Sequence, residues 1–121
     1  MKGYLLFLFL VLFFSCKDKT ISSGIEVCGV KDPIHNLPWL KAMIVDAKAN
    51  KQENILTVRM GKIRDEVVFD FNLIYMSCLG CVAYHCDGSR VDPSKYTPDE
   101  MMDFMTTIRG DGAKGPVLWP Q

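Results

Sequence analysis

Residues 55–73 read ILTVRMGKIRDEVVFDFNL, and this stretch decides the fold. Apolar side chains recur at every second position in two sets, Leu56, Val58 and Met60, then Val67, Phe69 and Phe71. A period of two is typical of strands with one buried face, so we expect strands at 55–60 and 67–73. The two strands should pair as an antiparallel hairpin. Glycine preference places its turn at Gly61-Lys62.

A third strand is predicted at 82–86. It runs into Asp87-Gly88, a pair typical of tight hairpin turns, and the chain should return through Arg90-Val91. Near the end of the sequence, 117–119 reads Val-Leu-Trp and is predicted to be an edge strand.

Two amphipathic helices flank these strands. The first, at 38–50, begins with Pro38, whose missing amide proton is no loss at a first helical position. The second, at 98–109, follows a capping box formed by Thr97 and Glu100. Apolar stripes with helical spacing comprise Leu40, Met43, Ile44 and Ala47 on the first, and Met101, Phe104, Met105 and Ile108 on the second. We interpret both stripes as core, the alternative for the methionine-rich one being an adaptable binding face.

The predicted fold class is therefore α+β, with a small antiparallel sheet of three to five strands packed against the two helices. Gly110 should end the second helix with a left-handed residue. Trp39 and Leu37 flank the start of the first helix and should plug the end of the core. A sugar-binding role for Trp39 is the alternative.

The first sixteen residues indicate where the protein is located. Lys2 precedes an unbroken apolar run at 5–14, which closes at Ser15-Cys16. This is the pattern of an export signal peptide. As a helix the run would span roughly 15 Å, about half of the ~30 Å hydrocarbon core of a membrane. We therefore expect it to be cleaved and not to serve as a membrane-spanning anchor.

Ser15-Cys16 resembles the end of a bacterial lipoprotein signal, where a small residue precedes the cysteine that receives a diacylglyceryl group. Lys17-Asp18 resembles the short charged signals that direct Bacteroidota-type lipoproteins to the outer face of the outer membrane. The resemblance implies lipidation of Cys16, and two or three acyl chains would give a stable anchor. The expected organisation has three parts: a signal peptide at 1–15, the lipidated cysteine with a flexible tether at 16–27, and one domain at 28–121.

Several motifs resemble an uncharacterised family of small Bacteroidota-type lipoproteins. They are Cys28 followed by Asp32-Pro33 and by Leu-Pro-Trp-Leu-Lys at 37–41, a CxxC at 78–81, a Tyr-x-Cys-x-Gly turn at 84–88, and an aliphatic-Trp ending at 118–119. The resemblance implies a hairpin turn at Arg64-Asp65 in place of Gly61-Lys62. The family has no known activity, so the resemblance implies a fold and a location and no function.

After Cys16, four cysteines remain: Cys28, Cys78, Cys81 and Cys86. An even number in an exported protein predicts two disulfides, with three possible connectivities. If Leu79-Gly80 is a tight loop between strands, Cys78 and Cys81 face each other with Cα atoms about 5.5 Å apart, within disulfide range. Cys81 and Cys86 would then lie roughly 16 Å apart along one strand. This geometry favours Cys78–Cys81 and Cys28–Cys86, while the connectivity stays open.

The same cysteines allow other interpretations. The CxxC at 78–81 superficially resembles that of thioredoxin-like redox proteins, in which a helix N-terminus lowers the pKa of the first thiol. Here the CxxC leads into a predicted strand, so that activation is missing. Zinc binding by Cys78, Cys81, His85 and Cys86 has suitable ligand types, but an oxidising compartment opposes it. C-type haem is excluded, because Val82 stands where its motif needs histidine.

Other residues that could carry chemistry are interpreted as structural. Gly110 to Gly115 matches GxGxxG, but it follows a helix and not a strand, so we expect a loop. His35 and His85 have no serine or carboxylate at an informative spacing. The chain carries 14 basic and 14 acidic side chains with no basic cluster, which argues against nucleic acid as a partner.

The sequence therefore predicts an exported, lipid-anchored envelope protein, surface-exposed at the outer membrane, that acts as a binding or structural module. Its expected partners are the membrane, through the N-terminal lipid, and a protein or glycan ligand. The alternative is a periplasmic or surface thiol-disulfide redox protein that uses Cys78 and Cys81. No catalytic constellation is readable, and no cofactor or metal is expected.

Overall fold

The structure is a computed structural model that describes residues 24–78, 80–109 and 115–120. This part of the chain contains three α-helices and two antiparallel sheets, which confirms the predicted α+β fold class. In chain order the elements are β1 (Glu26–Val27), β2 (Val30–Lys31), α1 (Pro33–Asn36), α2 (Pro38–Ala49), β3 (Leu56–Ile63), β4 (Glu66–Leu73), β5 (Ala83–His85), the 3-10 helix η2 (Pro93–Lys95), α3 (Pro98–Ile108) and β6 (Val117–Trp119). The smaller sheet pairs β1 with β2, and the larger has the strand order β5-β4-β3-β6.

The hairpin of β3 and β4 forms the centre of the larger sheet. Its register runs from Leu56 opposite Leu73 to Ile63 opposite Glu66. The turn is Arg64-Asp65, with φ angles of 51° and 63°, and positive φ at both positions is what a two-residue type I′ turn requires. The turn implied by the family resemblance is therefore confirmed, and the Gly61-Lys62 turn is wrong.

Gly61 has a different role from the one predicted. It is buried within β3, opposite Val68. A Cβ atom added there would lie 2.8 Å from Cε2 of Phe104, a distance that real Cβ atoms essentially never show. The glycine therefore allows α3 to approach the strand closely, which is one of the known uses of glycine inside a strand.

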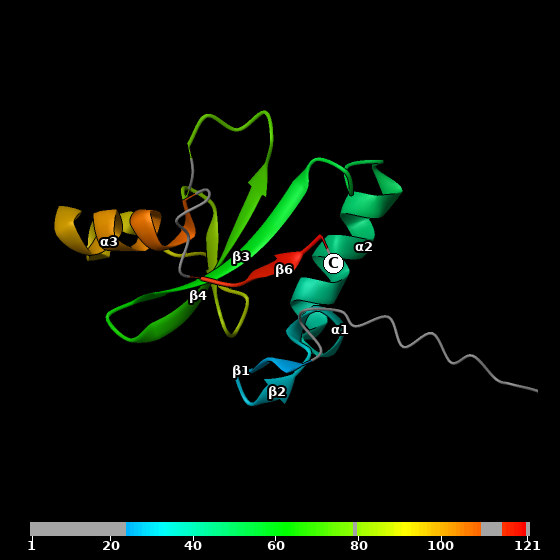
Figure 1. Cartoon of the computed structure of the whole chain (residues 1–121), viewed down its shortest axis with the longest axis horizontal. Helices are drawn as coiled ribbons and strands as arrows, with labels where there is room; N and C mark the ends of the chain where they lie inside the picture. Colours follow the sequence, from blue (N-terminus) through cyan, green and yellow to red (C-terminus); the bar gives the residue numbers. More distant parts are fainter. Residues whose placement is uncertain (1–23, 79, 110–114, 121) are drawn as a thin grey trace, which may run out of the picture.

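The larger sheet is covered on both faces, and Figure 1 shows it between α3 on the left and α2 on the right. On one face, Leu40 and Ile44 of α2 belong to a core that the sheet completes with Leu56, Val58, Phe69, Leu73 and Leu118. The predicted stripe of α2 thus lies against the apolar positions that defined the two strands.

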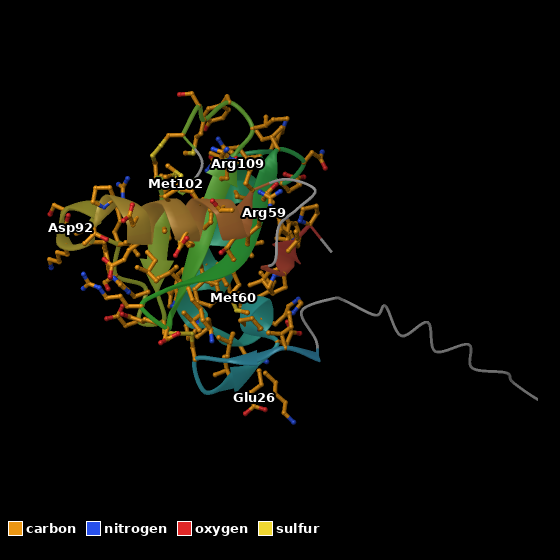
Figure 2. All side chains as sticks on the ribbon, turned by 60° about the vertical axis from the view of Figure 1, so that its left-hand side comes forward. Glu26, Arg59, Met60, Asp92, Met102 and Arg109 are labelled. Carbon is orange, nitrogen blue, oxygen red and sulfur yellow. A yellow bond between two sulfur atoms is a disulfide. The ribbon has the colours of Figure 1, made fainter. Side chains whose placement is uncertain are left out.

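The opposite face is covered by α3. Phe104 and Ile108 of this helix form a second core with Ile63, Val68, Ala83 and Val91. Figure 2 shows α3 lying across the sheet, with Asp92 before its N-terminal end and Arg109 at its C-terminal end. Because both faces are buried, β4 buries three successive residues, Val68, Phe69 and Asp70, where alternation predicts one exposed face.

The capping box of α3 is confirmed. The Glu100 amide donates to Oγ1 of Thr97 at 3.2 Å, and the Thr97 amide donates to Oε2 of Glu100 at 2.8 Å. Both helices match their predicted ranges to within one residue at each end. The predicted stop at Gly110 lies outside the described residues.

The link between β4 and β5 spans residues 74–82, nine residues, close to the eight that the predicted strands at 67–73 and 82–86 leave between them. The condition of the cysteine argument, a tight loop between strands at Leu79-Gly80, is therefore not met, and the third strand is shorter than 82–86. The Asp87-Gly88 turn is confirmed: the Gly88 amide donates to the His85 carbonyl at 3.0 Å, and Tyr84 forms a bridge with Arg90 on the return.

The two ends of the described chain add short strands. β6 pairs antiparallel with β3 at the edge of the larger sheet, as predicted for 117–119. β1 begins at Glu26, so the folded part starts inside the segment 16–27 that was expected to be a tether. The lipidation candidate Cys16 and the signal peptide lie outside the described residues.

Candidate functional site

The four cysteines of the expected domain form two pairs. Cys28 is bonded to Cys86, and Cys78 is bonded to Cys81, each with a Cα–Cα distance of 5.5 Å. These are the two pairs that the hairpin argument favours, although the loop between Cys78 and Cys81 belongs to a longer connection than that argument assumed.

The Cys28–Cys86 disulfide joins the β1–β2 turn to the end of β5. Both cysteines are partly buried and contact the core on the α2 face. Nε1 of Trp39 donates to the Cys86 carbonyl at 2.8 Å, and the Trp39 ring lies 5.7 Å from that of Tyr84. Trp39 therefore packs against this core beside the disulfide, which agrees with its predicted role as a core residue.

The Cys78–Cys81 disulfide closes a small ring on the surface. Both cysteines are exposed, whereas Gly80 between them is buried, with a φ angle of +77°. A Cβ atom added at Gly80 would lie 3.1 Å from Cγ of Met105 and 3.4 Å from Cδ1 of Ile108. The ring thus rests with its glycine against α3 and its sulfur-bearing residues toward solvent.

Asp70 lies beneath this ring and is fully buried in β4. The Gly80 amide donates to its Oδ1 at 3.2 Å, while its Oδ2 is buried and has no hydrogen-bond partner. Burial raises the pKa of Asp70 from 3.8 to about 6, against the opposing effects of the Gly80 amide and of the Arg59 charge. Arg59 stands opposite Asp70 on β3, and its buried Nε also has no partner.

Asp70 was not predicted as a site residue. It alternates with Phe69 and Phe71, so a strand with one buried face would leave it toward solvent, whereas α3 covers that side of the sheet. The available signal was a carboxylate in the middle of an apolar strand that leads to a CxxC. Buried titratable groups with displaced pKa values are common at functional sites.

The four residues that were considered as zinc ligands do not form a metal site among the described residues. Cys78, Cys81 and Cys86 are in disulfides, and Nδ1 of His85 lies 2.8 Å from Oε1 of Glu66. Across residues 24–78, 80–109 and 115–120, no group of three or more His, Cys, Asp and Glu side chains could hold a metal ion. His35 pairs with Asp32. Of the GxGxxG segment, Gly115 is described and 110–114 lie outside the described residues.

A groove of about 570 Å³ runs between the β3–β4 turn and α3. Its lining is mostly polar and charged: Lys62, Ile63, Arg64, Asp65, Glu100, Asp103, Thr106 and Thr107. Arg64 binds Glu100 through both carboxylate oxygens and lowers the pKa of Glu100 to about 2. The pair fixes the wall of the groove, which offers donors and acceptors to a polar ligand.

Comparison with known proteins gives no relative: the chain matches no protein-family model, no curated protein and no solved structure. In the part of the chain that the structure describes, none of the helices has the length and apolar character needed to cross a membrane. A function for the chain therefore rests on its own residues and their geometry.

Proposed function

We propose that the protein is an exported, lipid-anchored module of the cell envelope, exposed at the outer membrane surface and acting in binding or in structure. The pattern of residues 1–15 and the cysteine at Cys16 support export and lipidation. The observation that carries the proposal is the Cys28–Cys86 pair. Disulfides persist in oxidising compartments and are rare in the cytosol.

The position of this disulfide suits a domain held by its N-terminus. Cys28 follows Cys16 by only twelve residues, and β1 and β2 between the tether and α1 are two residues each. Two such short strands would separate easily under tension. The bond to Cys86 carries a pull on the tether directly to β5 and the larger sheet.

A ligand of the module would be a protein segment or a glycan. The groove beside α3 supports this class, because its charged and hydroxyl side chains can bond to polar groups. Arg64 and Glu100 are already paired there, so their positions need no rearrangement before binding.

The anchor is tested by labelling cells with radioactive palmitate. We expect label in the wild-type protein and none in Cys16→Ala. Cys81→Ala is the matched control, since it also replaces a cysteine by alanine and should keep the label. Protease digestion of intact cells then tests surface exposure. Equal labelling of wild type and Cys16→Ala would refute the lipid anchor.

The second candidate function is thiol-disulfide exchange at Cys78 and Cys81. It is favoured by one observation, the exposure of both cysteines in a small ring above the buried Asp70. Cys81 leads toward β5 and not into a helix, so no helix N-terminus lowers the pKa of a thiol there. Reduction of insulin by dithiothreitol provides the assay: a faster rate with wild type than with Cys78→Ala/Cys81→Ala supports exchange, and equal rates refute it.

A further inference from the structure

The Cys78–Cys81 ring and Asp70 form one local unit. We propose that this disulfide exchanges with thiols in the envelope and that Asp70, acting through the Gly80 amide, is the positioning residue that makes the exchange depend on pH. The proposal rests on the second candidate function and adds to it the regulation of the site. It depends on three observations: the exposed cysteines, the bond from Gly80 to Asp70, and the unpartnered Oδ2.

The two disulfides differ in how easily a thiol can reach and open them. Cys28 and Cys86 are partly buried, lie 58 residues apart in sequence and contact the core on the α2 face. Cys78 and Cys81 are exposed and lie three residues apart, so opening their bond frees only a short loop. Exposed disulfides are the labile ones, and long-range buried ones resist reduction. Exchange should therefore select Cys78–Cys81.

Asp70 is held in its buried state by the closed ring. The ring keeps Gly80 in a left-handed conformation against α3, and there its amide donates to Oδ1. The other oxygen has no partner, which is unfavourable for an ionised carboxylate in an apolar setting. If the bond opens and Gly80 moves off α3, water reaches Asp70 and the ionised form is stabilised.

The surroundings of Asp70 contain few other charges. β3 presents Arg59 opposite it, and β5 presents Ala83. Glu66 of β4 and His85 of β5 are further along the same face and bind each other. The α3 side chains in the core of that face are Phe104 and Ile108, both apolar. Arg59 favours the ionised carboxylate and burial opposes it, and burial has the larger effect.

Glutathione can serve as the thiol that reduces the Cys78–Cys81 disulfide. A glutathione thiolate attacks one sulfur of the Cys78–Cys81 bond, a mixed disulfide forms, and the other cysteine leaves as a thiolate that takes a proton from water. A second glutathione thiolate attacks the mixed disulfide and releases oxidised glutathione and the remaining cysteine. Two glutathiones are oxidised, and one disulfide is reduced to two thiols.

The direction of the pH effect follows from the burial of Asp70. In the closed ring its pKa is raised to about 6, and in an opened loop it should return toward 3.8. The closed form is thus favoured at low pH. As pH rises above about 4, the ionisation of Asp70 increasingly favours the opened form, and this effect levels off above about 6. Between pH 5 and 7 the equilibrium constant for reduction should rise about tenfold more in wild type than in a variant without this carboxyl.

The experiment uses the full-length protein in detergent, equilibrated with reduced and oxidised glutathione from pH 5 to 7. Alkylation and mass spectrometry then give the redox state of each cysteine pair. Asp70→Asn keeps the shape of the side chain and removes its titration, and Asp99→Asn, which replaces an exposed carboxylate of α3, is the matched control. We expect only Cys78–Cys81 to exchange. From pH 5 to 7, its equilibrium constant for reduction in the wild type, divided by that in Asp70→Asn, should rise about tenfold, whereas the same quotient taken with Asp99→Asn should not change.

The outcomes separate the two claims. If Cys78–Cys81 resists glutathione as firmly as Cys28–Cys86, the exchange function is overturned. If it exchanges but the ratio to Asp70→Asn does not change with pH, the role of Asp70 is overturned and exchange stands. Should Asp70→Asn fail to fold, carboxyl carbon NMR of the wild type replaces it. The pKa of Asp70 should then be lower in the reduced protein, and equal values in both forms refute the inference.

Discussion

Replacing Phe104 by alanine tests the packing of α3 on the sheet. The ring of Phe104 is fully buried, with 0 % of its surface exposed. Truncation of a buried phenylalanine costs about 3–5 kcal/mol of the free energy of unfolding. For a domain of this size each kcal/mol lowers Tm by about 4–8 °C, so Phe104→Ala should lower Tm by more than about 10 °C.

Gly61 provides a second and sharper test of the same contact. A methyl group at this position would lie 2.8 Å from Cε2 of Phe104 and 3.2 Å from Cγ2 of Ile108. Such overpacking costs about 1–3 kcal/mol. In the Phe104→Ala background the ring is absent and the new methyl group enters the space that it leaves. Gly61→Ala should therefore cost at least about 1 kcal/mol less there than in the wild type, a coupling that a double-mutant cycle measures.

The assay is thermal and urea unfolding of the full-length protein, followed by circular dichroism. Met102→Ala is the matched control, because Met102 is on the same helix and is 57 % exposed; it should change stability by less than about 0.5 kcal/mol. The packing is refuted if Phe104→Ala behaves like Met102→Ala, or if Gly61→Ala costs the same in both backgrounds.

Two further substitutions probe the covalent framework and the Trp39 contact. Cys28→Ser/Cys86→Ser should lower the free energy of unfolding by about 4 kcal/mol and Cys78→Ser/Cys81→Ser by about 2 kcal/mol, because the first bond closes a much longer loop; equal losses in urea unfolding would contradict this. Gly88→Ala should lower Tm and change the tryptophan fluorescence, since Gly88 has a φ angle of +84° and an added Cβ would lie 2.8 Å from Cγ of Trp39. Arg90→Ala, at an exposed position nearby, should leave both unchanged.

The parts of the fold that were predictable have local causes. The capping box of Thr97 and Glu100 fixes the start of α3 within four residues of sequence, and the stripe around Phe104 fixes its buried side. Period-two alternation in 55–73 likewise identifies both central strands. These signals need no knowledge of which segment packs on which.

The parts that were missed depend on contacts between distant segments. Gly61 was assigned to a turn because its real constraint, the ring of Phe104, lies 43 positions later in the sequence. The cysteine argument considered a tight loop at Leu79-Gly80, whereas Gly80 lies in a nine-residue link and packs against α3. Alternation in one strand also cannot indicate that helices will cover both faces of the sheet, which is why the burial of Asp70 was not predicted.

The burial of Asp70 has a consequence for stability as well as for chemistry. Its pKa is 3.8 in an ordinary setting and about 6 in the fold, so the folded protein binds a proton more tightly than the unfolded chain. The stability that this carboxyl contributes is present below pH 3.8 and is lost as pH rises through about 6, on the order of 3 kcal/mol in total. At neutral pH an apolar or amide side chain would suit the site better. The ionised Asp70 is thus unfavourable in the buried position where it accepts the hydrogen bond from Gly80. Opening of the Cys78–Cys81 ring would relieve this unfavourable burial.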